Sequence, residues 1–217
     1  MRLLILDGAL ARCSAALVVD GALVAEAMAE GARGQPQALP PLAARLLAEA
    51  GGRVEAVAVV VGPGGFTGLR TAIALAEGIA LGLDVPIVGL TTGEALAGAL
   101  PAALRQTHEI WSGIDTRRGR LVLERFAPGQ AVAGAAEAMA ERDLPRPAHP
   151  VAVVGDAAPV LAARLLARGH SAVLTPSRLP RAGAAAGLAW ARMRGEVAPR
   201  DGTPLYVEPP AVRVPGA

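Results

Sequence analysis

The sequence predicts an α/β protein made of two similar lobes. Residues 1–104 follow the order strand, strand, strand, helix, strand, helix, strand, helix, and the rest of the chain repeats this order in reduced form. Alternating strands and helices indicate sheets that are covered by helices. Because one architecture occurs twice, we predict two lobes, at residues 1–104 and 105–217.

The first lobe is expected to open with a three-stranded meander. Asp20-Gly21 supplies a hairpin turn between its second and third strands. The long helix that follows carries leucines at helical spacing and ends at two glycines. The expected strands cover residues 2–7, 13–19, 21–29, 57–61 and 86–90, and the expected helices cover 37–50, 66–83 and 92–104.

The second lobe is expected to open with a hairpin and to continue with alternating strands and helices. A polar, proline-rich stretch up to Pro150 separates these two parts, and residues 199–217 are expected to form a partly extended tail. The expected strands cover residues 109–115, 120–126, 150–154 and 172–174, and the expected helices cover 157–168 and 182–195.

The most informative segment is a strand, a glycine loop and a helix. A valine-rich run at 57–61 has the composition of a buried parallel strand. It leads into Gly62-Pro63-Gly64-Gly65-Phe66-Thr67-Gly68-Leu69-Arg70, where the glycines permit unusual backbone angles and the proline fixes one of them. Thr67 is expected to cap the helix that begins there.

The helix at 66–83 has only two charged residues, Arg70 and Glu77, whereas a monomer's surface helix should have a broader polar face. Two interpretations follow. The helix is either central to its own domain, or its column of small residues is uncovered and receives a helix of another subunit. The candidate interface residues are Phe66, Leu69, Arg70, Ala72, Ile73, Ala76 and Ala80.

Composition excludes several classes of protein. The 217 residues are 53% hydrophobic, enough for real cores, yet no apolar run has the length of a membrane span or the pattern of a signal peptide, so we expect a cytoplasmic protein without a membrane partner. The single cysteine, Cys13, excludes an internal disulfide. All 21 basic residues are arginine; the net charge is only +2, and the few aromatic residues argue against a base-stacking surface.

The sequence also lacks the motifs of common catalytic sites. His108, His149 and His170 lie far apart and form no metal-binding pair, so we expect no metal site. No Gly-x-Ser-x-Gly nucleophile elbow is present, and the glycine loop lacks the Lys-Ser/Thr ending of a P-loop. We therefore predict no catalytic residue.

The glycine loop resembles the signature Gly-Pro-Gly-Ser-Phe-Thr-Gly-Leu-Arg of the TsaB (YeaZ) family of bacterial tRNA threonylcarbamoyladenosine biosynthesis proteins. Eight of nine positions agree, and Gly65 stands where serine is usual. Residues 114–117, Ile-Asp-Thr-Arg, and 204–206, Pro-Leu-Tyr, are also similar to this family.

This resemblance implies a two-lobed actin-like ATPase fold (ASKHA, ribonuclease H-like), in which each lobe is a mixed sheet with flanking helices. It implies a non-catalytic subunit, a degenerate paralogue of TsaD, that dimerises with TsaD and activates it. The reaction makes N6-threonylcarbamoyladenosine at position 37 of tRNAs that read ANN codons. The implied partners are TsaD, the ATPase TsaE, a second copy of the chain when TsaD is absent, and tRNA only within the complex.

The alternative function is an actin-like ATPase or kinase with its own chemistry. Such a site would use Asp7 and Asp115, which end the first strand of each lobe. The turn at 8–11 offers no hydroxyl or cation to a phosphate, so we expect a vestigial nucleotide cleft, no cofactor, and at most weak ATP or ADP binding between the lobes. A basic turn, Arg117, Arg118 and Arg120, is either a solvated hairpin or a contact for tRNA.

Overall fold

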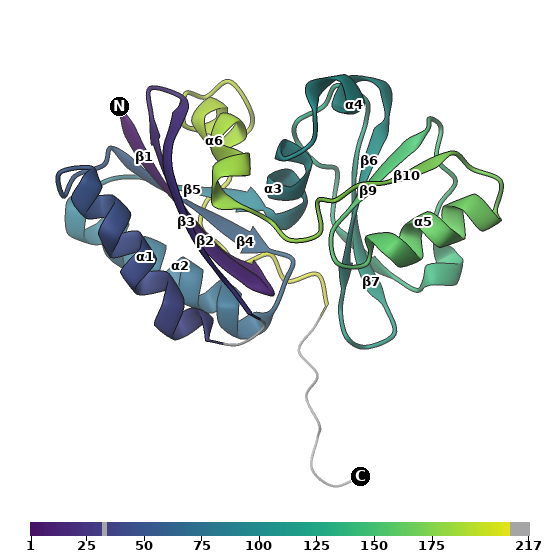
Figure 1. Ribbon diagram of the computed structural model, residues 1–217, viewed down its shortest axis with the longest axis horizontal. Coiled ribbons are helices and arrows are strands. Elements are labelled where there is room, and N and C mark those ends of the chain that lie inside the picture. Colours follow the sequence, from purple (N-terminus) through teal and green to yellow (C-terminus); the bar gives the residue numbers. More distant parts are fainter. Residues whose placement is uncertain (32–33, 209–217) are drawn as a thin grey trace, which may run out of the picture.

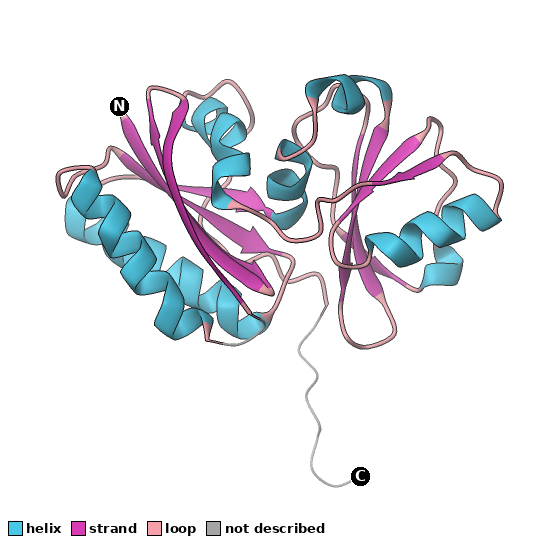
Figure 2. Cartoon of the chain, in the orientation of Figure 1, coloured by secondary structure: helices cyan, strands magenta, loops and turns pink. Residues whose placement is uncertain are grey.

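The chain forms two lobes that lie side by side, each built on a five-stranded sheet (Figure 1). The structure is a computed structural model that describes residues 1–31 and 34–208. Helices cover the sheets in both lobes (Figure 2), as predicted for an α/β protein. The part of the predicted tail after residue 208 lies outside the described residues.

The two sheets share one topology, which confirms the predicted repeat. The first has the strand order β3-β2-β1-β4-β5 and the second has β8-β7-β6-β9-β10. In each sheet the first three strands form an antiparallel meander, and the last two run parallel to the first strand. The strands are β1 Arg2–Leu10, β2 Arg12–Val19, β3 Ala22–Glu30, β4 Ala56–Gly62, β5 Ile87–Thr91, β6 Glu109–Asp115, β7 Leu121–Phe126, β8 Glu137–Met139, β9 Val151–Val154 and β10 Ala172–Leu174.

The first sheet is buried on both faces. Every residue of β4 is buried, as its run of valines predicts for a central parallel strand. Helices α1 and α2 cover one face, and η2 and α6 cover the other. The helices are α1 Gln35–Glu49, α2 Phe66–Leu83, α3 Thr92–Gly98, α4 Ala102–Thr107, α5 Ala158–Ala167 and α6 Ala186–Met193, and the 3-10 helices are η1 Glu141–Asp143 and η2 Ala182–Ala185.

Helix α3 lies between the lobes (Figure 1). Thr91 and Glu94 form a capping box at its start, in which each side chain bonds the other residue's backbone N–H. The single helix predicted over 92–104 is in fact two, because Pro101 cannot continue α3 and instead precedes α4. The apolar side of α3 packs against β6, β7 and β9 of the second sheet.

The predicted lobe boundary is wrong for the end of the chain. After β10 the chain crosses back, and η2 and α6 pack on the first sheet. We therefore call residues 1–104 and 182–208 lobe 1, and residues 105–181 lobe 2. Sequence order could not reveal this return, because α6 covers strands that lie more than a hundred residues earlier in the chain.

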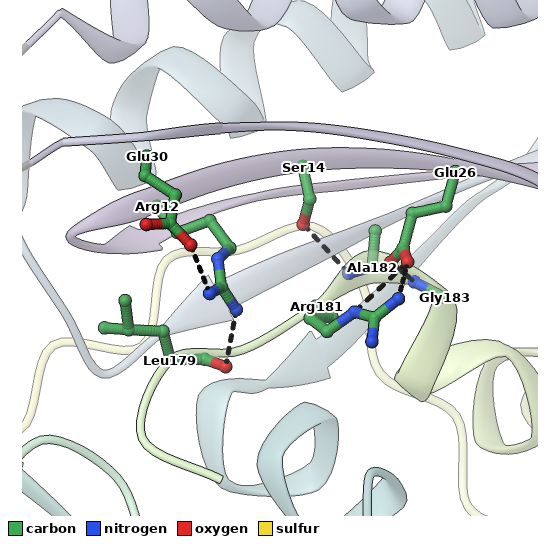
Figure 3. A network of polar contacts seen from close by, with 8 residues as sticks. All are labelled: Arg12, Ser14, Glu26, Glu30, Leu179, Arg181, Ala182 and Gly183. Carbon is green, nitrogen blue, oxygen red and sulfur yellow. Dashed lines mark hydrogen bonds and ion pairs between the residues drawn. The ribbon is translucent and has the colours of Figure 1, made fainter. Parts of the chain in front are cut away.

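Polar contacts fasten this crossing to β2 and β3 (Figure 3). Arg12 pairs with Glu30 at 2.7 Å and donates to the Leu179 carbonyl at 3.4 Å. Arg181 forms an ion pair with Glu26. The buried Ser14 hydroxyl accepts a bond from the Ala182 N–H at 2.9 Å, and Glu26 accepts one from the Gly183 N–H at 2.8 Å. These contacts hold the re-entering chain against lobe 1.

Candidate partner-binding surface and inter-lobe cleft

The glycine loop lets the start of α2 approach the end of β1 at backbone contact distance. A methyl group on Gly68 would collide with the carbonyl oxygen of Gly8, and one on Gly64 would collide with that of Ala9. The Gly65 N–H donates to the Ala9 carbonyl at 2.7 Å. The loop therefore serves to pack α2 against β1, and the Gly65 N–H is used in a bond to the protein's own backbone.

The prediction that Thr67 caps α2 is wrong. Gly65 occupies the N-cap position, and Thr67 lies inside the helix without a capping bond. The close approach of the loop to β1 starts the helix two residues earlier than a threonine cap would. The predicted helix bounds, 66–83, are nevertheless those observed.

One face of α2 belongs to the core of lobe 1. By length and apolar composition this helix could cross a membrane, but it packs against β1, β4 and α1. The expectation that its column of small side chains is uncovered is wrong, because the sheet and α1 bury that column. The buried members are Leu69, Ala72, Ile73, Ala76 and Ala80, each no more than 6% exposed.

The opposite face of α2 is exposed, and it too carries small and apolar residues. Ala74, Gly78 and Gly82 recur at four-residue intervals, and all three are exposed. A methyl group at Gly78 or Gly82 would meet no atom within 4 Å, and the neighbouring Leu81 is 85% exposed. The sequence alone does not indicate which side of this helix the sheet covers.

Two of the predicted interface residues, Phe66 and Arg70, do lie at the surface. The Arg70 guanidinium lies 3.5 Å from the centre of the Phe66 ring, and its Nε donates to the Tyr206 hydroxyl at 3.1 Å. The Phe66 and Tyr206 rings are stacked with centres 6.4 Å apart. The Leu205 N–H, donating to the Val61 carbonyl at 2.9 Å, holds this C-terminal segment on lobe 1. An aromatic and cationic cluster therefore extends the exposed face of α2.

The two predicted cleft carboxylates have different surroundings. Asp7 is fully buried; burial raises its pKa to about 7, although the Ala9 N–H donates to one of its oxygens at 3.0 Å. Asp115 has a side chain that is 41% exposed, and it pairs with Arg117 at 3.5 Å. A cavity of about 500 Å³ beside the crossing segment is lined by neither carboxylate.

A second buried carboxylate was not singled out from the sequence. Glu124 on β7 accepts a bond from the Gly93 N–H at 2.9 Å, which links lobe 2 to the start of α3. Burial is the main cause that raises its pKa to about 7; the nearby Glu94 carboxylate also raises the pKa, whereas hydrogen bonds from Thr91 and Gly93 lower it. Glu94 itself is paired with Arg192 at 2.8 Å, and both side chains are buried. The Thr-x-x-Glu pattern at 91–94 would have signalled the capping role of Glu94, but its pairing with Arg192 depends on the return of α6.

The described residues contain no group of three or more His, Cys, Asp or Glu side chains that could hold a metal ion. Cys13 is buried, as expected for a packing residue.

Residues 29–168, more than half of the chain, match the profile of the family described as "TsaD: tRNA N6-adenosine threonylcarbamoyltransferase". The chain belongs to this family. It is 33% identical over 124 residues to the tRNA threonylcarbamoyladenosine biosynthesis protein TsaB of Escherichia coli K12, which is 56% of this chain and 53% of that protein. The TsaB protein of Haemophilus influenzae is 32% identical over 121 residues, 54% of this chain and 50% of that protein. The chain spans about half the length of the curated relatives it matches.

Two solved structures that are similar to this chain cover almost the whole of it. YeaZ from Pseudomonas aeruginosa has 25% identity, a TM-score of 0.75, and coverage of 94% of this chain and 100% of its own. A second structure, described as an uncharacterized protein with similarity to peptidase YEAZ from the same organism, has 26% identity, a TM-score of 0.77, and coverage of 95% and 99%. These matches confirm the predicted two-lobed actin-like fold and the resemblance to TsaB and YeaZ.

Proposed function

We propose that this chain is an accessory subunit in tRNA threonylcarbamoyladenosine biosynthesis. It pairs with a catalytic TsaD paralogue through the exposed face of α2 and activates that paralogue for modification of position 37 in tRNAs that read ANN codons. The observation that carries the proposal is the row of exposed small residues, Ala74, Gly78 and Gly82, beside Leu81.

The occupant that suits this face is a helix of a related chain. With no side chain larger than a methyl group along the row, another helix backbone can approach closely, and flanking leucines can interdigitate. A paralogue with the same fold carries an equivalent helix after its own glycine loop. Two such helices, each backed by its own α1, would form a four-helix contact between the subunits.

The absence of an obvious catalytic arrangement supports an accessory role. A phosphoryl-transfer site needs carboxylates that reach metal and phosphate. Asp7 is sealed in the core and Asp115 bonds to the Arg117 N–H at 2.8 Å, so neither supports the alternative of an independent ATPase or kinase. The proposed role requires no cofactor, and weak ATP or ADP binding between the lobes stays a prediction that a nucleotide titration would test.

We place TsaE in the same assembly. When the paralogue is absent, we expect two copies of this chain to pair through the same face of α2. One surface then serves two competing contacts. Addition of the paralogue should dissociate the homodimer, which sizing by light scattering would detect. The role also places the chain in the cytoplasm, with tRNA.

The central experiment is co-expression with a TsaD paralogue, followed by sizing of the complex and an assay of tRNA modification. Ala74→Arg places a charge on the exposed row and should abolish the complex, since an unpaired charge in a close contact costs several kcal/mol. Ala163→Arg is the matched control, because Ala163 is an exposed alanine on α5 of lobe 2. A folded Ala74→Arg chain that still forms the complex would contradict the proposal. ATP turnover by the purified chain alone would favour the alternative.

A further inference from the structure

The geometry points to a pocket on lobe 2 that binds phosphate groups of the tRNA backbone. The pocket is a depression of about 600 Å³ lined by Leu144, Arg146, Arg168 and His170. Its polar lining consists of two guanidinium groups and one imidazole, with no carboxylate. Arginine forks match phosphate oxygens in a bidentate geometry, which makes an anion with several oxygens the fitting ligand.

The pocket is held in shape by the protein backbone. Arg168 follows the last turn of α5 and donates to the carbonyls of Leu144 at 2.7 Å and Arg142 at 2.5 Å. These two bonds fix the guanidinium while leaving some of its five N–H groups for a ligand. Gly169, with a φ of +78°, ends the helix, and the N–H of His170 returns to the Leu165 carbonyl at 3.0 Å. Two segments of lobe 2, residues 142–146 and 168–170, therefore converge on one site.

The other arginines of lobe 2 differ from those of the pocket, because most of them are paired with acids. Arg120 pairs with Glu208 at 3.0 Å, and Arg164 pairs with Glu141 at 3.3 Å. Even the basic turn noted in the sequence is largely neutralised, since Arg117 contacts two aspartates. Arg146 and Arg168, in contrast, form no ion pair with any described residue. Five arginines of lobe 2 form no ion pair with a described residue, and two of them lie at the pocket; the other three are Arg105, Arg118 and Arg178.

The net charges of the lobes point the same way. Residues 105–181 contain eleven arginines and seven acidic residues, a net charge of +4, whereas the remainder of the chain has ten and twelve, a net charge of −2. A polyanion is thus attracted to lobe 2 and repelled by lobe 1. The weak overall charge of +2 hides this asymmetry.

We choose RNA phosphate over other anions because the family is named for reactions on tRNA, so this inference rests on the proposed function. The pocket lining contains no Phe, Tyr or Trp ring, and its two guanidinium groups suit phosphate oxygens, so we assign it contacts with the RNA backbone. It would orient tRNA on the accessory subunit while the paralogue performs the chemistry.

The test measures tRNA affinity and complex assembly on the same proteins. A transcribed tRNA is titrated by fluorescence anisotropy between 50 and 200 mM salt, once with the chain alone and once with its complex with the TsaD paralogue. Arg146→Ala should weaken binding about tenfold near 0.1 M salt and lower the slope of log affinity against log salt by about one. Arg146→Glu should weaken it further. Arg194→Ala, an exposed arginine on lobe 1 that pairs with Glu196, is the matched control and should bind as the wild type does.

Arg146 carries the test because it is exposed and forms no hydrogen bond with a described side chain, so its loss leaves the fold intact. Arg168→Ala also removes two backbone contacts, and its circular dichroism must match the wild type before its affinity is used. Wild-type tRNA affinity in both Arg146 variants, with the chain alone and in the complex, would overturn the inference.

Two further outcomes separate the possible causes of failure. If no complex with the paralogue forms on sizing, the proposed function fails, while the titration of the chain alone still decides the inference. If phosphorus NMR shows that Arg146→Glu loses inorganic phosphate but tRNA affinity is unchanged, the pocket is a site for free phosphate, and the assignment to RNA is overturned.

Discussion

The two faces of α2 are built from the same kinds of residue but have opposite surroundings. One face, with Ala72, Ala76 and Ala80, is closed by the first sheet and α1. The other face carries Ala74, Gly78 and Gly82, and a methyl group added at either glycine would meet no atom within 4 Å. Small residues therefore do not mark an interface by themselves. The useful signal is a small residue whose missing side chain would point into open space.

The largest expected effect tests the closed face. Ala76→Arg forces a guanidinium into a core where Ala76 has no exposed surface, so we expect a loss of at least about 4 kcal/mol in the free energy of unfolding. That loss approaches the whole stability of a typical domain. Urea denaturation followed by circular dichroism measures it. Ala74→Arg lies two positions earlier, on the open face, and should unfold at nearly the wild-type urea concentration. Equal losses of unfolding free energy in the two variants would contradict the proposed difference between the two faces of α2.

The contact of α2 with β1 gives the next largest effect. Gly68→Ala drives a methyl group into the Gly8 carbonyl, and backbone on both sides must move, which we expect to cost about 2 kcal/mol. The midpoint of thermal unfolding should fall by several degrees. A variant as stable as the wild type would show that β1 and α2 are less closely packed than their carbonyl contact implies.

A pH titration probes two buried carboxyls, Asp7 on β1 and Glu124 on β7. The pKa values of Asp7 and Glu124 rise to about 7 in the folded chain, so the folded state binds more protons than the unfolded state between about pH 4 and 7. The free energy of unfolding should therefore decrease as pH rises through this window and level off above it. Asp7→Asn removes one of these two titrating groups and should make the decrease across the window smaller.

The control for that titration is Ala74→Gln on the open face of α2, which changes an exposed residue without removing an ionisable group. It should leave the slope unchanged. Stability that increases between pH 4 and 7 in the wild type would contradict the assignment of proton-bearing carboxyls to the core.

The smallest expected effect is a gain. Gly78→Ala adds a methyl group that meets no atom within 4 Å and improves helix propensity, so the isolated chain should gain about 0.5 to 1 kcal/mol. Thermal unfolding of the chain alone measures this gain. In the proposed complex the same methyl group should weaken pairing, and unchanged affinity for the paralogue would show that the partner helix lies elsewhere.

Local patterns in the sequence were enough to predict most elements of this fold. The bounds of α2, β6 and β10 are those expected, because alternation, glycine stops and valine runs are properties of neighbouring residues. The repeat of one topology was also visible in the order of elements. Pro101 could have warned that α3 and α4 are separate helices, since proline rarely continues a helix.

Features that depend on distant segments could not be predicted. The buried side of α2 is set by where β1 and β4 lie. Arg192 and Glu94 are nearly a hundred residues apart and meet only because α6 returns to lobe 1. The free charge at Arg146 likewise emerges only when its neighbours' ion pairs are known.

The path of the chain makes lobe 2 an insertion within lobe 1. The polypeptide leaves lobe 1 after α3 and re-enters beside the same helix, where the Ser177 hydroxyl donates to the Leu96 carbonyl at 3.0 Å. The points where the chain leaves and re-enters lobe 1 are therefore adjacent. A short glycine linker from Leu100 to Ser177 would replace lobe 2 and leave the first sheet and α2 unchanged. Lobe 2 can therefore be replaced or altered without changing the exposed face of α2 on lobe 1.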